Sequence, residues 1–204
     1  MGIVVMLATL GIMCRNRFIG WGFSAWAWTV RLRGRFARLG RPRLGALEHV
    51  TIPVKDLTLA RKFYCEVLGA SYFMTIDDET FRRFGRPPAE NNGEGSHHVS
   101  VYMGGVTRLD LFLQSAGQPP ANAGHPHYAF KVSPRDLRKW QRILEENGVP
   151  CDGPMQLGPP GQASLYFNDP FGNHLEVTCM GFTDPIPVRA PAMTRLTWSA
   201  GTAL

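Results

Sequence analysis

From residue 46 onward, hydrophobic and polar residues alternate in short runs of the kind that forms β-strands. Two other segments have helical spacing. The first begins at Asp56, a helix N-cap residue, and stops at Gly69, and the second runs from Ser133 to Gly148. The strand-like runs are LEHVTIPV, ASYFMTI, HHVSVYM, TRLDLFLQ, HYAFKV, PMQL, ASLYF and HLEVTC. Strands on both sides of each helix predict an α+β fold.

The order of these elements repeats, since each half reads strand, helix and then about three strands. His49 and His127 open equivalent strands 78 residues apart, and Leu59 and Leu137 keep the same offset in the helices. An internal duplication is the simplest account. We therefore expect one domain at residues 46–182 with paired βαβββ modules at 46–115 and 125–182. A C-terminal tail without usable periodicity follows at residues 183–204.

Residues 1–45 differ from the rest of the chain in composition. They contain eight arginines, no lysine and no acidic residue. These arginines exceed the net charge of +6, so the remainder carries 14 basic and 16 acidic residues and gives no reason to expect nucleic acid. We expect a poorly ordered extension here, with a transit peptide or a membrane-surface segment as alternatives. Its apolar start of 13 residues is too short to span a bilayer.

The remaining composition is that of an ordinary globular domain. The chain is 44% hydrophobic and 19% charged. Its four cysteines are widely spaced and form no C-x-x-C pair. We therefore expect reduced thiols and a cytoplasmic protein.

Four predicted strands place an imidazole or a carboxylate on the face opposite their apolar residues. These side chains are His49, Asp110, His127 and Glu176. A curved sheet turns such a face toward a concave cavity, where two imidazoles and one carboxylate would form a facial triad with open positions for a substrate. A lone strand histidine or glutamate is more often a solvated side chain. The duplication, together with the turn DPFGN at residues 169–173, selects His49, His127 and Glu176.

On these residues the chain resembles the vicinal oxygen chelate superfamily, which includes glyoxalase I, extradiol dioxygenases, fosfomycin-modifying thiol transferases and bleomycin-binding proteins. The resemblance covers about residues 46–180 and rests on HVTIPVKDLTLARKFYCEVLGA, HYAFKVSPRDL and YFNDPFGNHLEV. It implies a cupped mixed sheet around a metal site, usually completed by dimer contacts. His49, His127 and Glu176 match the metal ligands of the family. Asp110 stands where glyoxalase I has a glutamate as fourth ligand.

The sequence also departs from individual members of the family. Pro53 stands where many glyoxalases use an arginine to hold glutathione, which disfavours glutathione isomerisation. The loop QLGPPGQ lacks the lysine, arginine or serine that would bind a phosphonate. The same loop lacks the acid/base histidine of extradiol dioxygenases, for which His98 or His125 is a substitute candidate.

The resemblance implies an enzyme that uses one divalent metal (Fe, Mn, Zn or Ni) as a Lewis acid on a small organic substrate chelated through adjacent oxygens. Its reaction is expected to be like that of a dioxygenase or a thiol transferase, in a homodimer. We expect Tyr166 to donate a hydrogen bond or a proton to the substrate, and Thr51 and Ser164 to line the pocket. Asp110 is either a fourth ligand or a carboxylate that orients an imidazole. A metal-free protein that binds a small molecule or a drug is the alternative.

Overall fold

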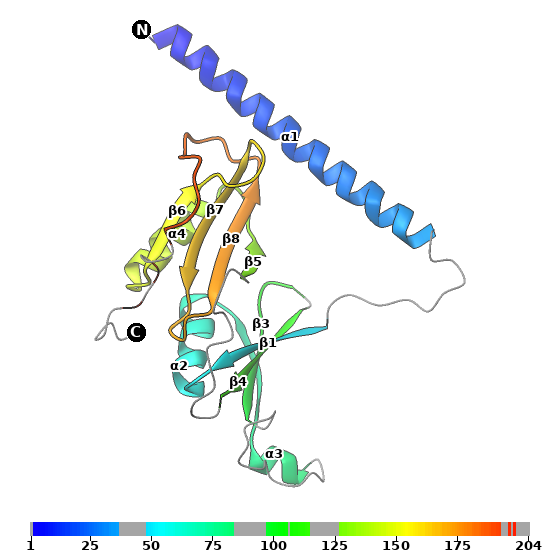
Figure 1. Cartoon of the computed structure of the whole chain (residues 1–204), viewed down its shortest axis with the longest axis vertical. Coiled ribbons are helices and arrows are strands. Elements are labelled where there is room, and N and C mark those ends of the chain that lie inside the picture. Colours follow the sequence, from blue (N-terminus) through cyan, green and yellow to red (C-terminus); the bar gives the residue numbers. More distant parts are fainter. Residues whose placement is uncertain are drawn as a thin grey trace.

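The computed structural model describes residues 2–36, 48–83, 97–105, 107–114, 127–192, 196 and 198. It contains a long N-terminal helix followed by two modules that repeat one order of elements (Figure 1). The helix is α1 (Gly2–Phe36). The first module comprises β1 (His49–Val54), α2 (Leu57–Arg61), η1 (Lys62–Val67), β2 (Ser71–Ile76), α3 (Asp78–Arg83), β3 (His98–Tyr102) and β4 (Arg108–Leu113). The second comprises β5 (Tyr128–Lys131), α4 (Leu137–Glu146), β6 (Cys151–Met155), β7 (Gln162–Asn168) and β8 (His174–Met180).

Each module forms its own four-stranded mixed sheet. The strand orders are β1-β4-β3-β2 and β5-β8-β7-β6, with the first strand parallel to the last and the other pairs antiparallel. Thr51 pairs with Asp110 in the first sheet, and Ala129 pairs with Glu176 in the second. His49 lies two residues before Thr51, and His127 lies two residues before Ala129. His49 and Asp110 in the first sheet therefore occupy positions equivalent to those of His127 and Glu176 in the second. The predicted α+β class with paired βαβββ modules is confirmed.

The helices of both modules end at the predicted glycines but differ in how they begin. Asp56 caps α2, since its carboxylate accepts a hydrogen bond from the Leu59 backbone N–H at 2.9 Å. In the second module the Ser133 hydroxyl instead donates to the Asp136 carboxylate, and the helix starts one turn later than predicted. Gly148 ends this helix with a φ of +67°, a conformation that costs glycine least.

One hydrophobic core runs through both modules. Phe63 and Tyr64 on η1 are fully buried in it, as are Leu144 on α4 and Phe167 on β7. The turn between β7 and β8 joins the modules by hydrogen bonds as well. The Tyr64 hydroxyl donates to the Asp169 carboxylate at 3.0 Å.

Residues 2–36 of the N-terminal extension form the single helix α1, where the sequence analysis expected poor order. The first proline of the chain is Pro42, so no residue of α1 interrupts the helical hydrogen bonds. Within the part of the chain that the structure describes, no helix is both long enough and apolar enough to cross a membrane.

Residues 183–192 of the C-terminal tail are irregular and attached to β6. The Arg189 guanidinium forms two hydrogen bonds with the Asp152 carboxylate, at 2.6 and 2.8 Å. A short β-bridge joins Gln156 to Val188. The strand preceding this bridge begins at Cys151, three residues earlier than the predicted run PMQL, because Asp152 and its neighbours pair with β7.

Candidate metal and substrate site

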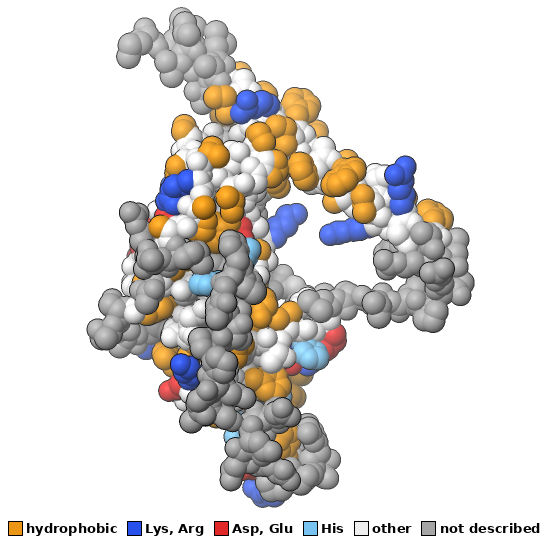
Figure 2. Space-filling view, viewed as in Figure 1, with side chains coloured by type: hydrophobic (Ala, Val, Ile, Leu, Met, Phe, Trp, Pro, Cys, Tyr) orange, Lys and Arg blue, Asp and Glu red, His pale blue; other side chains and the backbone are white. Residues whose placement is uncertain are grey.

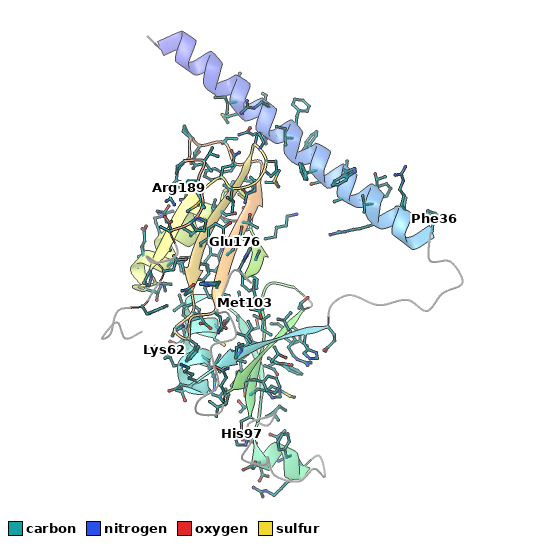
Figure 3. The ribbon with its side chains drawn as sticks, in the orientation of Figure 1. Phe36, Lys62, His97, Met103, Glu176 and Arg189 are labelled. Atoms are coloured by element: carbon teal, nitrogen blue, oxygen red, sulfur yellow. The ribbon has the colours of Figure 1, made fainter. Side chains whose placement is uncertain are left out.

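The second sheet brings His127 and Glu176 together on its polar face. His127 precedes β5 and Glu176 lies in the middle of β8, where Figure 3 labels it. The imidazole Nε2 lies 2.9 Å from the carboxylate Oε2. The glutamate side chain is 7% exposed and the histidine side chain 31%, so a buried carboxyl group is paired with an imidazole that reaches solvent. A buried carboxyl group needs a hydrogen-bond partner or a metal ion.

Hydroxyl and amide groups of the neighbouring strand surround this carboxylate. The Ser164 hydroxyl donates to Glu176 Oε1 and accepts a hydrogen bond from the Gln162 side-chain N–H, and both contacts are short. Thr178 extends the network, with its hydroxyl 2.9 Å from that of Ser164. Positions 162, 164 and 166 share one face of β7 by alternation. Gln162 was not among the predicted site residues, although its place two residues before Ser164 could have identified it.

Tyr166 lies beside the histidine–glutamate pair, as the sequence analysis expected of a residue near the substrate. Its ring is edge-on to the His127 ring at a centroid distance of 6.1 Å. Burial and the negative charge of Glu176 raise the pKa of the Tyr166 phenol. The phenol therefore remains protonated at neutral pH and can donate a hydrogen bond.

The donors at His127 and Glu176 suit a divalent metal ion. Imidazole nitrogen and carboxylate oxygen are ligands of Fe, Mn, Zn and Ni. Two such ligands at about 2.1 Å and a right angle lie about 3 Å apart, close to the 2.9 Å between these atoms. The second module thus supplies two donors at a spacing that one ion can bridge.

The other predicted ligands lie on the first sheet and have different partners. The His49 imidazole contacts the Glu48 carboxylate closely. Asp110 is buried and receives a hydrogen bond from Ser100 at 2.6 Å and a two-pronged contact from Arg108 at 2.8 and 3.0 Å. Burial raises the pKa of Asp110, but the hydrogen bonds from Arg108 and Ser100 outweigh it and hold the pKa below its usual value. Arg108 occupies the oxygens that a metal would need.

No group of three or more metal-binding side chains occurs among the residues that the structure describes. His127, Glu176, Ser164 and Tyr166 are brought together, whereas His49, Thr51 and Asp110 belong to the other sheet. Whether His49, His127 and Glu176 hold one ion therefore stays a prediction.

Of the two histidines suggested as acid/base candidates, the structure describes His98 but not His125. His98 lies on β3, where its ring stacks on Phe112 at 4.2 Å between centroids, and its Nδ1 is buried without a hydrogen-bond partner. Burial lowers the pKa of His98. This histidine is on the first sheet, away from Glu176. His125 lies outside the described residues.

A cleft of about 670 Å³ lies between the two modules. Met103, labelled in Figure 3, lines it from the first module together with Val50 and Leu109. Tyr128 and Phe130 of β5 line it from the second module and are only half-buried. Apolar side chains that a β-sheet core would normally cover are therefore accessible along β5.

Residues 46–177, more than half of the chain, match the model of the Glyoxalase/Bleomycin resistance protein/Dioxygenase superfamily. The chain is 28% identical over 152 residues to 2-epi-5-epi-valiolone epimerase of Actinomyces sp., covering 68% of this chain and 81% of that protein. It is 28% identical over 137 residues to the glutathione transferase FosA of Serratia marcescens, covering 66% and 80%.

Solved structures support the fold as well. The fosfomycin resistance protein FosX of Listeria monocytogenes superimposes with a TM-score of 0.51 at 15% identity, covering 67% of this chain and 94% of FosX. These matches confirm the resemblance drawn from the sequence motifs.

Proposed function

Because the chain belongs to the Glyoxalase/Bleomycin resistance protein/Dioxygenase superfamily, we propose that it is a divalent-metal-dependent enzyme acting on a small organic substrate. The observation that carries this proposal is the contact between His127 Nε2 and Glu176 Oε2 at 2.9 Å. A hydroxyl network fixes the carboxylate, and the imidazole reaches solvent.

We further propose that a second copy of the chain completes the metal site with His49. The described part of the chain has β1 and β5 as edge strands of its two sheets, and a predicted ligand lies in or beside each. Pairing β1 of one copy with β5 of another would bring His49 toward His127 and Glu176. It would also cover the half-buried Tyr128 and Phe130. Unpaired edges and accessible apolar residues both favour such an interface.

The metal, held by His127, Glu176 and the partner copy's His49, would act as a Lewis acid on adjacent substrate oxygens. Residues around the ion would orient its carboxylate ligand and bind the substrate. Ser164 and Gln162 keep the Glu176 carboxylate in one orientation through hydrogen bonds. Tyr166 stays protonated and donates a hydrogen bond to an oxygen on which negative charge develops.

The substrate class follows from the groups around the pair. Gln162, Ser164, Tyr166 and Thr178 are uncharged donors, which suits hydroxyl and carbonyl oxygens better than a dianion. The related proteins named above include an epimerase and a transferase. We propose dioxygenase-like or thiol-transferase-like chemistry on an oxygen-rich substrate, with epimerisation as a further candidate. Drug binding without a metal is the alternative.

Metal content tests the proposal. Elemental analysis of protein purified without chelator or nickel resin should find about one metal per chain. His127→Ala and Glu176→Ala should lose it, while His97→Ala, a change at a part-exposed histidine on the first module, should keep it. If the unsubstituted protein neither contains nor takes up Fe, Mn, Zn or Ni, the enzyme proposal is wrong and the binding alternative stands.

Mixing two variants tests whether the site is shared between chains. His49→Ala and Glu176→Ala should each lack metal on their own. After they are unfolded together and refolded, half of the dimers are mixed, and one of the two sites in each is intact. Metal binding should then return to about a quarter of the original level. A site made within one chain would show no recovery.

A further inference from the structure

Helix α1 leaves large apolar side chains exposed along its described length. Phe18 is 70% exposed and Trp21 75% exposed, and Trp26, Trp28 and Phe36 are similarly open. Figure 2 shows hydrophobic side chains in orange beside blue Lys/Arg side chains along this helix. Single exposed apolar residues are normal on proteins, but a continuous series of aromatic residues indicates a binding surface.

Contacts with the second module fix the middle of α1. The Asn16 side-chain N–H donates to the Phe182 carbonyl at 2.9 Å, and both residues are buried. One turn later, Gly20 is buried, and a Cβ added to it would lie 3.5 Å from the Gly181 backbone nitrogen. The helix is thus seated at these residues, while its C-terminal half points away from the sheets (Figure 1).

The exposed apolar side chains surround the helix instead of forming one stripe. At about 3.6 residues per turn, Trp21 and Trp28 fall on one side, and Phe23 and Val30 fall nearly opposite. A seam between two helices needs a single stripe. Aromatic residues on all sides do not match the single seam of one protein partner, and they suit the boundary layer of a lipid surface, which touches a helix over much of its circumference.

The charges of α1 favour a negatively charged medium. Arg15, Arg17, Arg31 and Arg33 are exposed, and no acidic residue occurs before Glu48. A second copy of α1 would place arginine against arginine, whereas lipid phosphates pair with arginine, and tryptophan prefers the boundary between lipid headgroups and acyl chains. The long arginine side chains can reach the headgroups while the aromatic rings lie in the boundary region.

We propose that α1 binds the surface of an anionic lipid membrane and thereby holds the two modules beside it. The aromatic side chains enter the boundary region, and the arginines pair with lipid phosphates. The contacts of Asn16 and Gly20 with Phe182 and Gly181 connect the membrane-bound helix to the second module. This inference is independent of the proposed reaction, because it involves none of the residues around Glu176.

Vesicle flotation of the full chain tests the proposal. Vesicles of phosphatidylcholine mixed with phosphatidylglycerol should carry the protein, and vesicles of phosphatidylcholine alone should carry much less. Arg31→Gln/Arg33→Gln should lower binding roughly 25-fold at low salt, from about fivefold per arginine. Trp21→Ser/Trp26→Ser/Trp28→Ser should abolish it.

Matched variants elsewhere on the surface serve as controls. Arg82→Gln/Arg83→Gln removes two exposed arginines from α3, and Phe73→Ser removes a 48% exposed aromatic residue from β2. Both should bind vesicles like the unsubstituted protein.

Fluorescence places the helix directly. In a Trp140→Phe/Trp198→Phe background, every remaining tryptophan lies on α1, and brominated lipid should quench its emission. Absence of flotation and quenching would overturn the proposal, as would equal binding to both vesicle types. The molecular mass of the protein in solution without lipid gives a further outcome. If that mass exceeds one chain and Trp21→Ser/Trp26→Ser/Trp28→Ser lowers it, α1 binds a second copy of the chain instead.

Discussion

Asp110→Asn distinguishes a structural carboxylate from a fourth metal ligand. Asp110 accepts one hydrogen bond from Ser100 and two from Arg108. The asparagine would turn an N–H group toward the guanidinium or the hydroxyl and leave Arg108 with Glu48 as its remaining carboxylate partner. Hydrogen bonds to charged groups contribute about 1.5–3 kcal/mol each, and removing one partner of a buried pair costs about 3–5 kcal/mol. Since Arg108 is partly exposed, we expect a loss of about 3 kcal/mol.

Urea unfolding followed by circular dichroism measures this loss at neutral pH. Asp152→Asn is the matched control, because Asp152 is buried on the other sheet and has the same two-pronged contact with Arg189. Both variants should lose a similar amount of stability and retain the metal content of the unsubstituted protein. A loss below about 1 kcal/mol together with a loss of metal would refute the structural role and make Asp110 a ligand.

The pH dependence provides a second check on the same carboxylate. Its folded-state pKa lies below its unfolded value, so the folded protein binds this proton less readily. The stability contributed by Asp110 is therefore present above the unfolded pKa of about 4 and is lost as the pH falls through the folded value. The unsubstituted protein should lose stability in this acidic range more steeply than Asp110→Asn.

Three further predictions concern buried groups outside this pair. Burial raises the pKa of Asp169 to about 6, so its contribution to the unfolding free energy should fall by about 2 kcal/mol as pH rises from 4 to 6.5, a change that Asp169→Asn should lack. Ser164→Ala removes the O–H donor to Glu176 and should cost about 2 kcal/mol in urea unfolding, with Ser133→Ala, on an exposed turn, as control. A thiol reagent should label exposed Cys14 in the native protein and reach buried Cys179, whose pKa burial raises to about 11, only after unfolding; early labelling of Cys179 would contradict its burial.

The sequence predicts the fold well because each strand carries its own period-two pattern and the duplication repeats it. Asp56, Gly69 and Gly148 mark helix ends through local backbone chemistry, which neighbouring residues alone determine. The start of α4 was predicted one turn early, because the Ser133 hydroxyl donates to the Asp136 side chain and does not accept from a backbone N–H as an N-cap would. The helical state of α1 was missed because its pattern is apolar on all sides and has no period to read.

The candidate site could be predicted only in part. Alternation on β7 and β8 places Ser164, Tyr166 and Glu176 on one face, and the structure has them there. The partner of Asp110 could not be read from the sequence, although Arg108 lies two residues away on the same face of the same strand. The way the two sheets face each other depends on how the modules pack and on whether a second copy of the chain binds. Neither can be read from the pattern of a single strand.

The proline in β1 limits how this sheet can grow. Backbone groups of a strand alternate between its two sides. The Glu48 carbonyl accepts a hydrogen bond from Arg108 of β4, and the Val54 carbonyl accepts one from Gln114, which directly follows β4. Pro53 therefore has its backbone on the outer side, where it lacks an N–H and its carbonyl already accepts from the Asn173 side chain at 2.9 Å. Only the stretch around His49 and Thr51 remains to pair with an added strand. An added strand can therefore pair with β1 in one register only. Pro53 and Asn173 also discourage indefinite edge-to-edge stacking of the sheet into fibrils.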